Sequence, residues 1–272
     1  MADPVHFFLH VPKCAGTTVE THFARVLGEG FLLAPRWRNP LRDVIGNRYP
    51  SLAGRDLSGV RLVSGHSLSA SLAAHFPGRP VRESVLLRDP LSFLVSFYNY
   101  RWARHHERGE RAPPPFPVWR RSQRRNPIAQ FLLSRYFGHG VPAIYALSTR
   151  ARFLTLEAAF ARFRFVGSWR RCSEAVAGIS AELGVPGDAP PENVGRTRAL
   201  RAEDLPEAER RAILAEHALD QLIFDRWADR GFDPARNPPD PQTAARALPA
   251  WDGPAQIPAD LESAIRRKLH RR

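Results

Sequence analysis

The stretch VHFFLHVPKCAGTTVETHFARVL, residues 5–27, decides the fold. It opens with a short apolar run, VHFFLHV, that stops at a proline, a pattern typical of a buried strand reaching a loop. After the loop PKCAGTT, apolar residues recur at helical spacing through Val19, Phe23 and Val26. A strand, a glycine-containing loop and a helix in this order favour a phosphate-binding loop, because the backbone N–H groups and the dipole at a helix N-terminus attract anions.

The rest of the chain repeats this alternation of strands and helices. We expect short strands at 60–64 and 84–87, and a strand with a turn at 163–169. Apolar spacing predicts helices after Pro90 and in the segments 127–138, 151–162, 171–184 and 206–230. The pattern predicts a three-layer α/β fold, with a central, mostly parallel sheet flanked by helices.

In such sheets, ligands bind outside the carboxyl ends of the strands. The loop PKCAGTT, His66 and Arg88 each follow a predicted strand. We therefore expect these three segments to meet at one edge of the sheet.

The chain divides by composition into two parts. Residues 1–233 are predicted to form one domain, and 234–272 a Pro-rich, basic C-terminal extension. Within the domain, the Arg- and Pro-rich segment 101–127 is predicted to be a long loop or lid. Its arginines are expected to attract an anionic substrate, and they include Arg120, Arg121, Arg124 and Arg125.

Composition limits the classes of function. The formal net charge of +13 favours polyanionic partners, although a coding bias towards arginine explains it equally well. The arginines are not interleaved with aromatic residues in a nucleic-acid motif, so we expect no nucleic acid partner. We find no apolar run long enough to span a bilayer and no secretory signal. Two cysteines and no metal-ligand cluster favour a cytoplasmic enzyme without a metal.

Lysine is rare in this chain. The only lysines are Lys13 and Lys268, and every other basic residue except histidine is arginine. A lysine head is a compact point charge, whereas arginine is a wide planar fork. The use of lysine at position 13 indicates that the loop requires the smaller group.

The loop is not a Walker A motif, because its lysine precedes the glycine. Gly16 permits close backbone approach to an anion, and Thr17 and Thr18 offer hydroxyl donors or a plain helix N-cap. No predicted strand ends in the acidic residue that holds Mg²⁺ in nucleoside triphosphatases. A P-loop kinase or NTPase remains an alternative, as does a non-catalytic polyanion-binding module.

Several segments resemble the carbohydrate-type sulfotransferases. HVPKCAGTT is similar to the 5′-phosphosulfate loop of that family, and RDPLSFLVSFYNY to its 3′-phosphate segment. FVGSWRRCSEAVAGISAELG, ENVGRTR and LDQLIFDRW resemble later parts, so the similarity spans about 5–232. One departure is Arg170, where relatives often carry glutamate. The resemblance implies a P-loop-like sulfotransferase fold.

It also implies an activity and a set of site residues. A sulfuryl group would pass from 3′-phosphoadenosine 5′-phosphosulfate to a hydroxyl or amine of an acceptor, with a glycan favoured and a small metabolite open. The 5′-phosphosulfate would be held by six consecutive residues: Lys13, Cys14, Ala15, Gly16, Thr17 and Thr18. The resemblance assigns the 3′-phosphate to Arg88 and Ser96. Alternatively, Arg88 forms a salt bridge with Asp89, and Ser96 bonds its own helix backbone.

The catalytic residues follow from the chemistry of an in-line displacement. Lys13 is expected to stabilise the leaving group, and His66 is favoured as the base that accepts the acceptor's proton. Alternatively, His66 only caps its strand. Glu20 is the next candidate for the base, and His10, His75, His105 and His106 are weaker ones.

Overall fold

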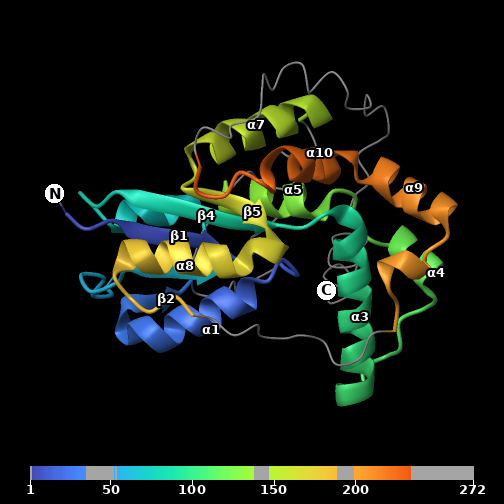
Figure 1. Ribbon diagram of the computed structural model, residues 1–272, viewed down its shortest axis with the longest axis horizontal. Helices are drawn as coiled ribbons and strands as arrows, with labels where there is room; N and C mark the ends of the chain where they lie inside the picture. Colours follow the sequence, from blue (N-terminus) through green and yellow to red (C-terminus); the bar gives the residue numbers. More distant parts are fainter. Residues whose placement is uncertain (1, 35–51, 53, 138–146, 189–198, 234–272) are drawn as a thin grey trace, which may run out of the picture.

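Five strands form one sheet in the computed structural model, which describes residues 2–34, 52, 54–137, 147–188 and 199–233 (Figure 1). The strands are β1 (Val5–Leu9), β2 (Phe31–Leu33), β3 (Leu62–Gly65), β4 (Val81–Leu87) and β5 (Phe165–Ser168). Their order is β2-β3-β1-β4-β5, and every pair of neighbours is parallel. The predicted α/β fold is confirmed.

The central strand β1 explains why the first apolar run decides the fold. All five of its residues are buried, because β3 and β4 flank it and helices cover both faces of the sheet. Phe7 and Phe8, which point to opposite faces, are 0% and 1% exposed. One run of the sequence therefore contributes to the core on both sides of the sheet.

Helices cover the two faces in separate layers (Figure 1). One layer holds α1 (Gly16–Leu27) and α8 (Cys172–Leu183), which pack against each other. The other holds α5 (Pro127–Phe131), α7 (Thr149–Arg162) and α10 (Ala218–Trp227), with α10 in contact with both of its neighbours. Asp220 of α10 accepts hydrogen bonds from the backbone N–H groups of Ile128 and Ala129, so it joins α10 to the start of α5.

A further helix, α3 (Pro90–Arg108), begins directly after β4 and runs away from the sheet (Figure 1). The helices α4 (Phe116–Arg121) and α9 (Glu207–Glu216) pack against it. Short turns complete the description: η1 (Gly28–Gly30), η2 (Ala70–His75), the π-helical η3 (Leu132–Tyr136), η4 (Trp169–Arg171) and η5 (Ala202–Asp204).

The predicted loop 101–127 is wrong in part, because much of it is helical. α3 continues to Arg108, where Gly109 adopts the left-handed conformation that ends many helices. Arg104 supports this last part of α3 by pairing with Glu110 and donating to the hydroxyl of Tyr100. The segment also contains the short helix α4.

Two other expectations differ from the structure. The helix predicted at 206–230 divides into α9 and α10 at His217, whose Nδ1 accepts a hydrogen bond from the Asn126 backbone. The three-residue strand β2 was not predicted. The extension 234–272 and the motif at 192–198 lie outside the described residues. None of the described helices combines the length and hydropathy needed to cross a bilayer.

Candidate active site

The loop between β1 and α1 has an unusual backbone. Lys13 and Ala15 have φ angles of 64° and 62°, in the left-handed region that favours glycine. Residues other than glycine adopt this conformation at a cost of about 1 kcal/mol or more each, and such strain is concentrated at functional sites. Asn126 is the only other non-glycine residue with positive φ in the described ranges.

The N-terminus of α1 has no side-chain cap among its own residues. Its N-cap is Ala15, which has no side-chain oxygen to receive the first N–H groups of the helix. Thr17 and Thr18 lie inside the first turn, so neither is the N-cap. Thr17 is exposed and Thr18 is buried. The arrangement suits an anion at the N-terminus of the helix.

Gly16 is required for a reason that the sequence did not indicate. A Cβ added at this position would lie 2.1 Å from Cδ2 of His10, too close for any real contact. The imidazole of His10 therefore occupies the space beside Gly16 that a side chain would fill.

Lys13 connects the loop to α3 and to the end of β4. Its Nζ lies 4.5 Å from the centre of the Tyr100 ring, and its carbonyl accepts a hydrogen bond of 2.8 Å from Arg88 Nη1. Burial, together with the charge of Arg88, lowers the pKa of Lys13 below its ordinary value. The Arg88 side chain, which follows β4, therefore contacts the backbone of the loop that follows β1.

The guanidinium of Arg88 is held at this edge of the sheet by a cation–π contact with Trp169. Its guanidinium lies 4.0 Å from the centre of the Trp169 ring, which follows β5. Arg88 Nε and Trp169 Nε1 are buried donors without a partner among the described residues. Asp89 instead caps α3 by accepting from the Ser92 N–H at 2.8 Å, and its other oxygen lies 3.9 Å from Arg170. The expected alternative, an Arg88–Asp89 salt bridge, is not formed in this part of the structure.

Ser96 lies on α3 one turn before Tyr100, so the two residues share a helix face. Tyr100 contacts Lys13, and this face is therefore turned towards the loop. Ser134 and Thr155 bond the backbone of their own helices, whereas no such bond of Ser96 occurs in the described part of the chain. Ser96 is half-buried.

His66 lies directly after β3 and is exposed. Its Nδ1 donates a 2.7 Å hydrogen bond to the carbonyl oxygen of His10, because that oxygen can only accept. In the neutral ring this places the lone pair on Nε2, the tautomer that a base requires. Gly65 before it has a φ of 134°, a conformation that a side chain would strain.

His10 and Glu20 form a cluster with His66. The His10 and His66 rings lie 4.0 Å apart between centroids. Glu20 Oε2 is 2.8 Å from His10 Nδ1, a contact that becomes an ion pair when His10 is protonated, and Oε1 accepts from Ser64 Oγ at 2.8 Å. Burial opposes the charge of Glu20, but these neighbours outweigh it and lower its pKa. Sequence reasoning treated His10 and Glu20 only as alternative bases.

The cysteine of the loop is buried, and its backbone N–H donates to the carbonyl oxygen of Val11 at 3.3 Å. Cys14 is 1% exposed, and burial raises the pKa of its thiol, which therefore stays protonated. Cys172 lies near the loop from the other side, with Sγ 3.9 Å from the carbonyl oxygen of Ala15. Both cysteines are free thiols.

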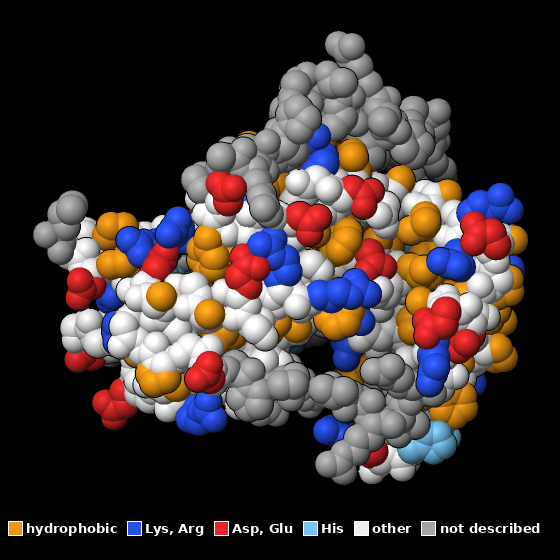
Figure 2. Space-filling model, viewed as in Figure 1, with side chains coloured by type: hydrophobic (Ala, Val, Ile, Leu, Met, Phe, Trp, Pro, Cys, Tyr) orange, Lys and Arg blue, Asp and Glu red, His pale blue; other side chains and the backbone are white. Residues whose placement is uncertain are grey.

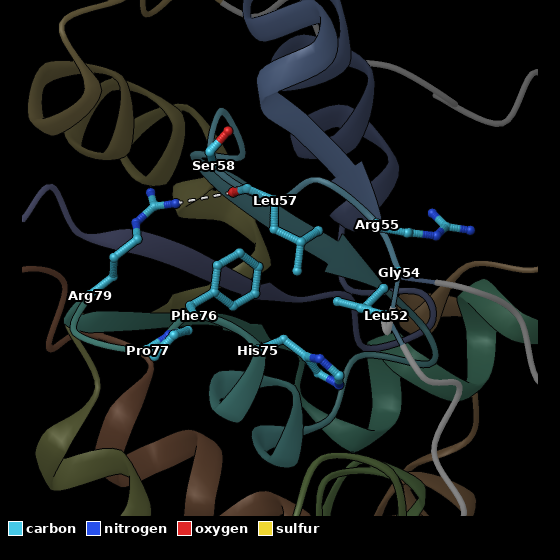
Figure 3. Close-up of a pocket in the computed structure, with 9 residues that line it drawn as sticks. All are labelled: Leu52, Gly54, Arg55, Leu57, Ser58, His75, Phe76, Pro77 and Arg79. Atoms are coloured by element: carbon cyan, nitrogen blue, oxygen red, sulfur yellow. Dashed lines mark hydrogen bonds between the residues drawn. The ribbon is translucent and has the colours of Figure 1, made fainter.

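Other predicted residues lie away from this cluster. In the last part of α3, His106 stacks on Trp102 and His105 contacts the same ring edge-on. His75 lines a pocket of about 390 Å³ with Phe76 and Arg79, beside the segment that leads into β4 at the amino edge of the sheet (Figure 3). Arg79 is held there by the carbonyl oxygens of Asp3, Pro4 and Leu57.

The expectation that Arg120 attracts a substrate is wrong. Its side chain is only 5% exposed and pairs with Glu209 and Glu216 of α9. It belongs to the contact between α4 and α9. Arg121, next to it, is exposed.

In the space-filling view an opening separates α3 from the side of the molecule that carries α1 and α8, and Lys and Arg side chains lie along it (Figure 2). The described residues contain no group of three or more His, Cys, Asp or Glu side chains that could hold a metal ion.

Comparison with known proteins adds little to this geometry. No family model matches the chain, and no curated protein matches it. A solved structure described as a sulfotransferase from Alicyclobacillus acidocaldarius is 15% identical, with a TM-score of 0.40, over 83% of this chain and 97% of that one. A similarity this weak carries no argument about function, which has to be inferred from the site itself.

Proposed function

We propose that the chain is a sulfotransferase that moves a sulfuryl group from 3′-phosphoadenosine 5′-phosphosulfate to a hydroxyl or amine of an acceptor. The observation that carries the proposal is Lys13. A lysine, rare in this chain, sits in a strained left-handed conformation before an uncapped helix, with its carbonyl held by Arg88. These features support a site for an anion whose reaction needs a compact positive charge.

The polar groups of this edge support the assignment of the donor. The 5′-phosphosulfate would lie against the loop, held by the backbone and side chains of Lys13, Cys14, Ala15, Gly16, Thr17 and Thr18. The 3′-phosphate is assigned to Arg88 and Ser96. The buried Arg88 Nε, which lacks a partner among the described residues, supports this assignment, because a buried donor without an acceptor is costly.

The chemistry is an in-line displacement at sulfur. A lone pair of the acceptor oxygen or nitrogen forms the new bond, and the bond from sulfur to the bridging oxygen breaks, leaving negative charge on the 5′-phosphate. Lys13 would stabilise that charge, and His66 Nε2 would take the acceptor's proton. The transferred group carries less charge than a phosphoryl group, so we propose that no metal takes part.

Two finer features are also proposed. The net charge of +13 supports an anionic acceptor, and we favour a glycan over a small metabolite. The presence of only two cysteines, both free, supports a cytoplasmic location.

Calorimetry with nucleotides tests the donor assignment. We expect 3′-phosphoadenosine 5′-phosphate to bind more tightly than AMP, which lacks the 3′-phosphate, and more tightly than ATP with Mg²⁺. Arg88→Lys should reduce this preference over AMP, because lysine cannot offer a planar fork to phosphate. Equal affinity for AMP would remove the role of Arg88 and Ser96, and preference for Mg-ATP would identify a kinase or NTPase. A screen of acceptors with labelled donor would then identify the substrate.

A further inference from the structure

The side chain of His10 is enclosed between the loop, Glu20 and His66. On one side its ring fills the space next to Gly16, on another it lies against the His66 ring with 4.0 Å between the centroids, and its Nδ1 lies 2.8 Å from Glu20. It is 6% exposed, which restricts ring rotation. His10 also fixes His66 through its backbone, since its carbonyl accepts from His66 Nδ1.

Glu20 in turn is fixed by two elements. It projects from α1, and Ser64 of β3 donates to it at 2.8 Å. The cluster contains three titratable side chains, Glu20, His10 and His66. Ser64 and the ring of Phe131, which lies 6.3 Å from the His66 ring, also border it and are uncharged. The Glu20 carboxylate, 2.8 Å from His10 Nδ1, places a negative charge beside the two rings.

We propose that Glu20 and His10 are positioning residues for His66, an inference that rests on the proposed role of His66 as the base. The His10 ring sets the plane of the His66 ring, and Glu20 holds the His10 ring in place. The negative charge of Glu20 also favours the imidazolium that His66 becomes after it accepts a proton. Because the His10 ring lies against Gly16, the orientation of the base is linked to the loop assigned to the donor.

This assignment excludes Glu20 as the base. A carboxylate that contacts His10 with one oxygen and Ser64 with the other has a lowered pKa, which weakens it as a proton acceptor. His66, exposed at the edge of the sheet with its lone pair on Nε2, is the group that reaches substrate.

The test is the titration of His66, followed by NMR of the imidazole signals in the whole chain without donor or acceptor. The His66 signals are assigned by their loss in His66→Gln. In Glu20→Gln, which removes the charge but keeps the shape, His66 should titrate at lower pH than in the natural protein. Glu20→Asp, which keeps the charge, should restore much of the difference. Glu29→Gln, an exposed change of the same charge beyond the end of α1, should leave the titration unchanged.

Kinetics supply the second readout. Glu20→Gln should reduce kcat roughly 10- to 100-fold, by analogy with the loss found when a group that orients a metal-ligating histidine is removed. The affinity for 3′-phosphoadenosine 5′-phosphate should stay the same, and the pH limb of kcat/KM should move in the same direction as the NMR titration. In His10→Phe, which keeps a ring and the backbone carbonyl but not Nδ1, the Glu20-dependent part of the His66 titration should be lost.

Unchanged titration of His66 in folded Glu20→Gln and His10→Phe would overturn the positioning role, whatever the activity of the protein. Failure of the natural protein to bind 3′-phosphoadenosine 5′-phosphate would instead overturn the proposed function, and it would leave the titration result standing. The two failures are therefore distinguishable.

Discussion

Lys13 combines two features that conflict with ordinary residue preferences. It is one of two lysines in an arginine-rich chain, and it holds a left-handed backbone that favours glycine or asparagine. Either feature alone is compatible with a residue that has no functional role. Together they indicate that the side chain at this position is retained despite its backbone cost, as strained residues at functional sites are.

Lys13→Arg should therefore fold and bind 3′-phosphoadenosine 5′-phosphate, yet lose turnover by about 10²- to 10³-fold, since a wide fork cannot place its charge at the bridging oxygen. The measurement is kcat with labelled donor and the acceptor found by screening, beside a melting curve. Lys268→Arg, the same change at the other lysine, is the control and should keep full activity. Full activity of Lys13→Arg would show that the rarity of lysine here has no functional cause.

For single residues, the sequence predicted the motif residues better than it predicted which residues contact them in space. Lys13 and Arg88 were expected at one edge, and the hydrogen bond from Arg88 to the Lys13 carbonyl brings them together there. The reason for Gly16 was not predictable, because it depends on where the His10 ring lies. The stacking of Trp169 on Arg88 was missed for the same reason: it joins residues far apart in the sequence.

Among the elements, α5 and α10 are joined by a buried carboxylate. Asp220 of α10 is 2% exposed and accepts the backbone N–H groups of Ile128 and Ala129. Burial raises the pKa of Asp220 to about 7, although the two hydrogen bonds oppose the shift. Asp220, the first aspartate of the segment LDQLIFDRW, therefore fixes the start of α5. The sequence pattern alone did not reveal this role.

This raised pKa predicts a pH dependence of stability. The pKa of Asp220 is about 7 in the folded protein and 3.8 when unperturbed, so its contribution is complete below about pH 4 and is lost as the pH rises through 7. Asp220→Asn has no such titration. The difference in unfolding free energy between the natural protein and this variant should therefore be greater at pH 5 than at pH 8 by about 2 kcal/mol.

Urea unfolding at the two pH values measures that difference. Asp3→Asn, an exposed change of the same charge ahead of β1, should show little dependence on pH. If both variants respond to pH alike, Asp220 is ionised in the folded protein across this range.

The helices and strands that sequence reasoning found are those with strong local patterns. β1 is a continuous apolar run, and α1, α7 and α8 follow helical spacing close to the predicted bounds. β2 escaped because it has only three residues, which are too few to show a period. The break between α9 and α10 depends on Asn126, 91 residues away from His217, and no local pattern encodes it.

For the whole molecule, the net charge of +13 conceals how the arginines are used. Many are paired within the fold, as Arg82 is with Glu182, Arg162 with Glu83 and Arg226 with Glu157. The sequence treated the arginines of 101–127 as one group facing a substrate. In the structure some of these arginines are buried and others are exposed. Arg120 and Arg121, although adjacent in the sequence, therefore have different roles.

Arg120 and Arg121 allow charge and structure to be measured separately. Each change to serine lowers the net charge by the same amount, but only Arg120 is buried and paired with two glutamates of α9. Arg120→Ser leaves Glu209 and Glu216 without the cation that both contact, and it should lower the unfolding free energy by about 3 kcal/mol. Arg121→Ser should change it by no more than about 0.5 kcal/mol.

The same two variants test whether glycan binding depends on the net charge or on individual exposed arginines. Salt-dependent binding to an immobilised sulfated glycan oligosaccharide, below the unfolding transition of both variants, should weaken more for Arg121→Ser, because the exposed Arg121 is free to meet an anion at the surface. Arg120 already has its charge balanced inside the fold, so its loss should affect stability and leave the glycan contact nearly unchanged. Equal loss of stability in the two variants would contradict the buried pairing. A greater loss of glycan binding in Arg120→Ser than in Arg121→Ser would show that Arg120 contacts the acceptor, as the sequence predicted.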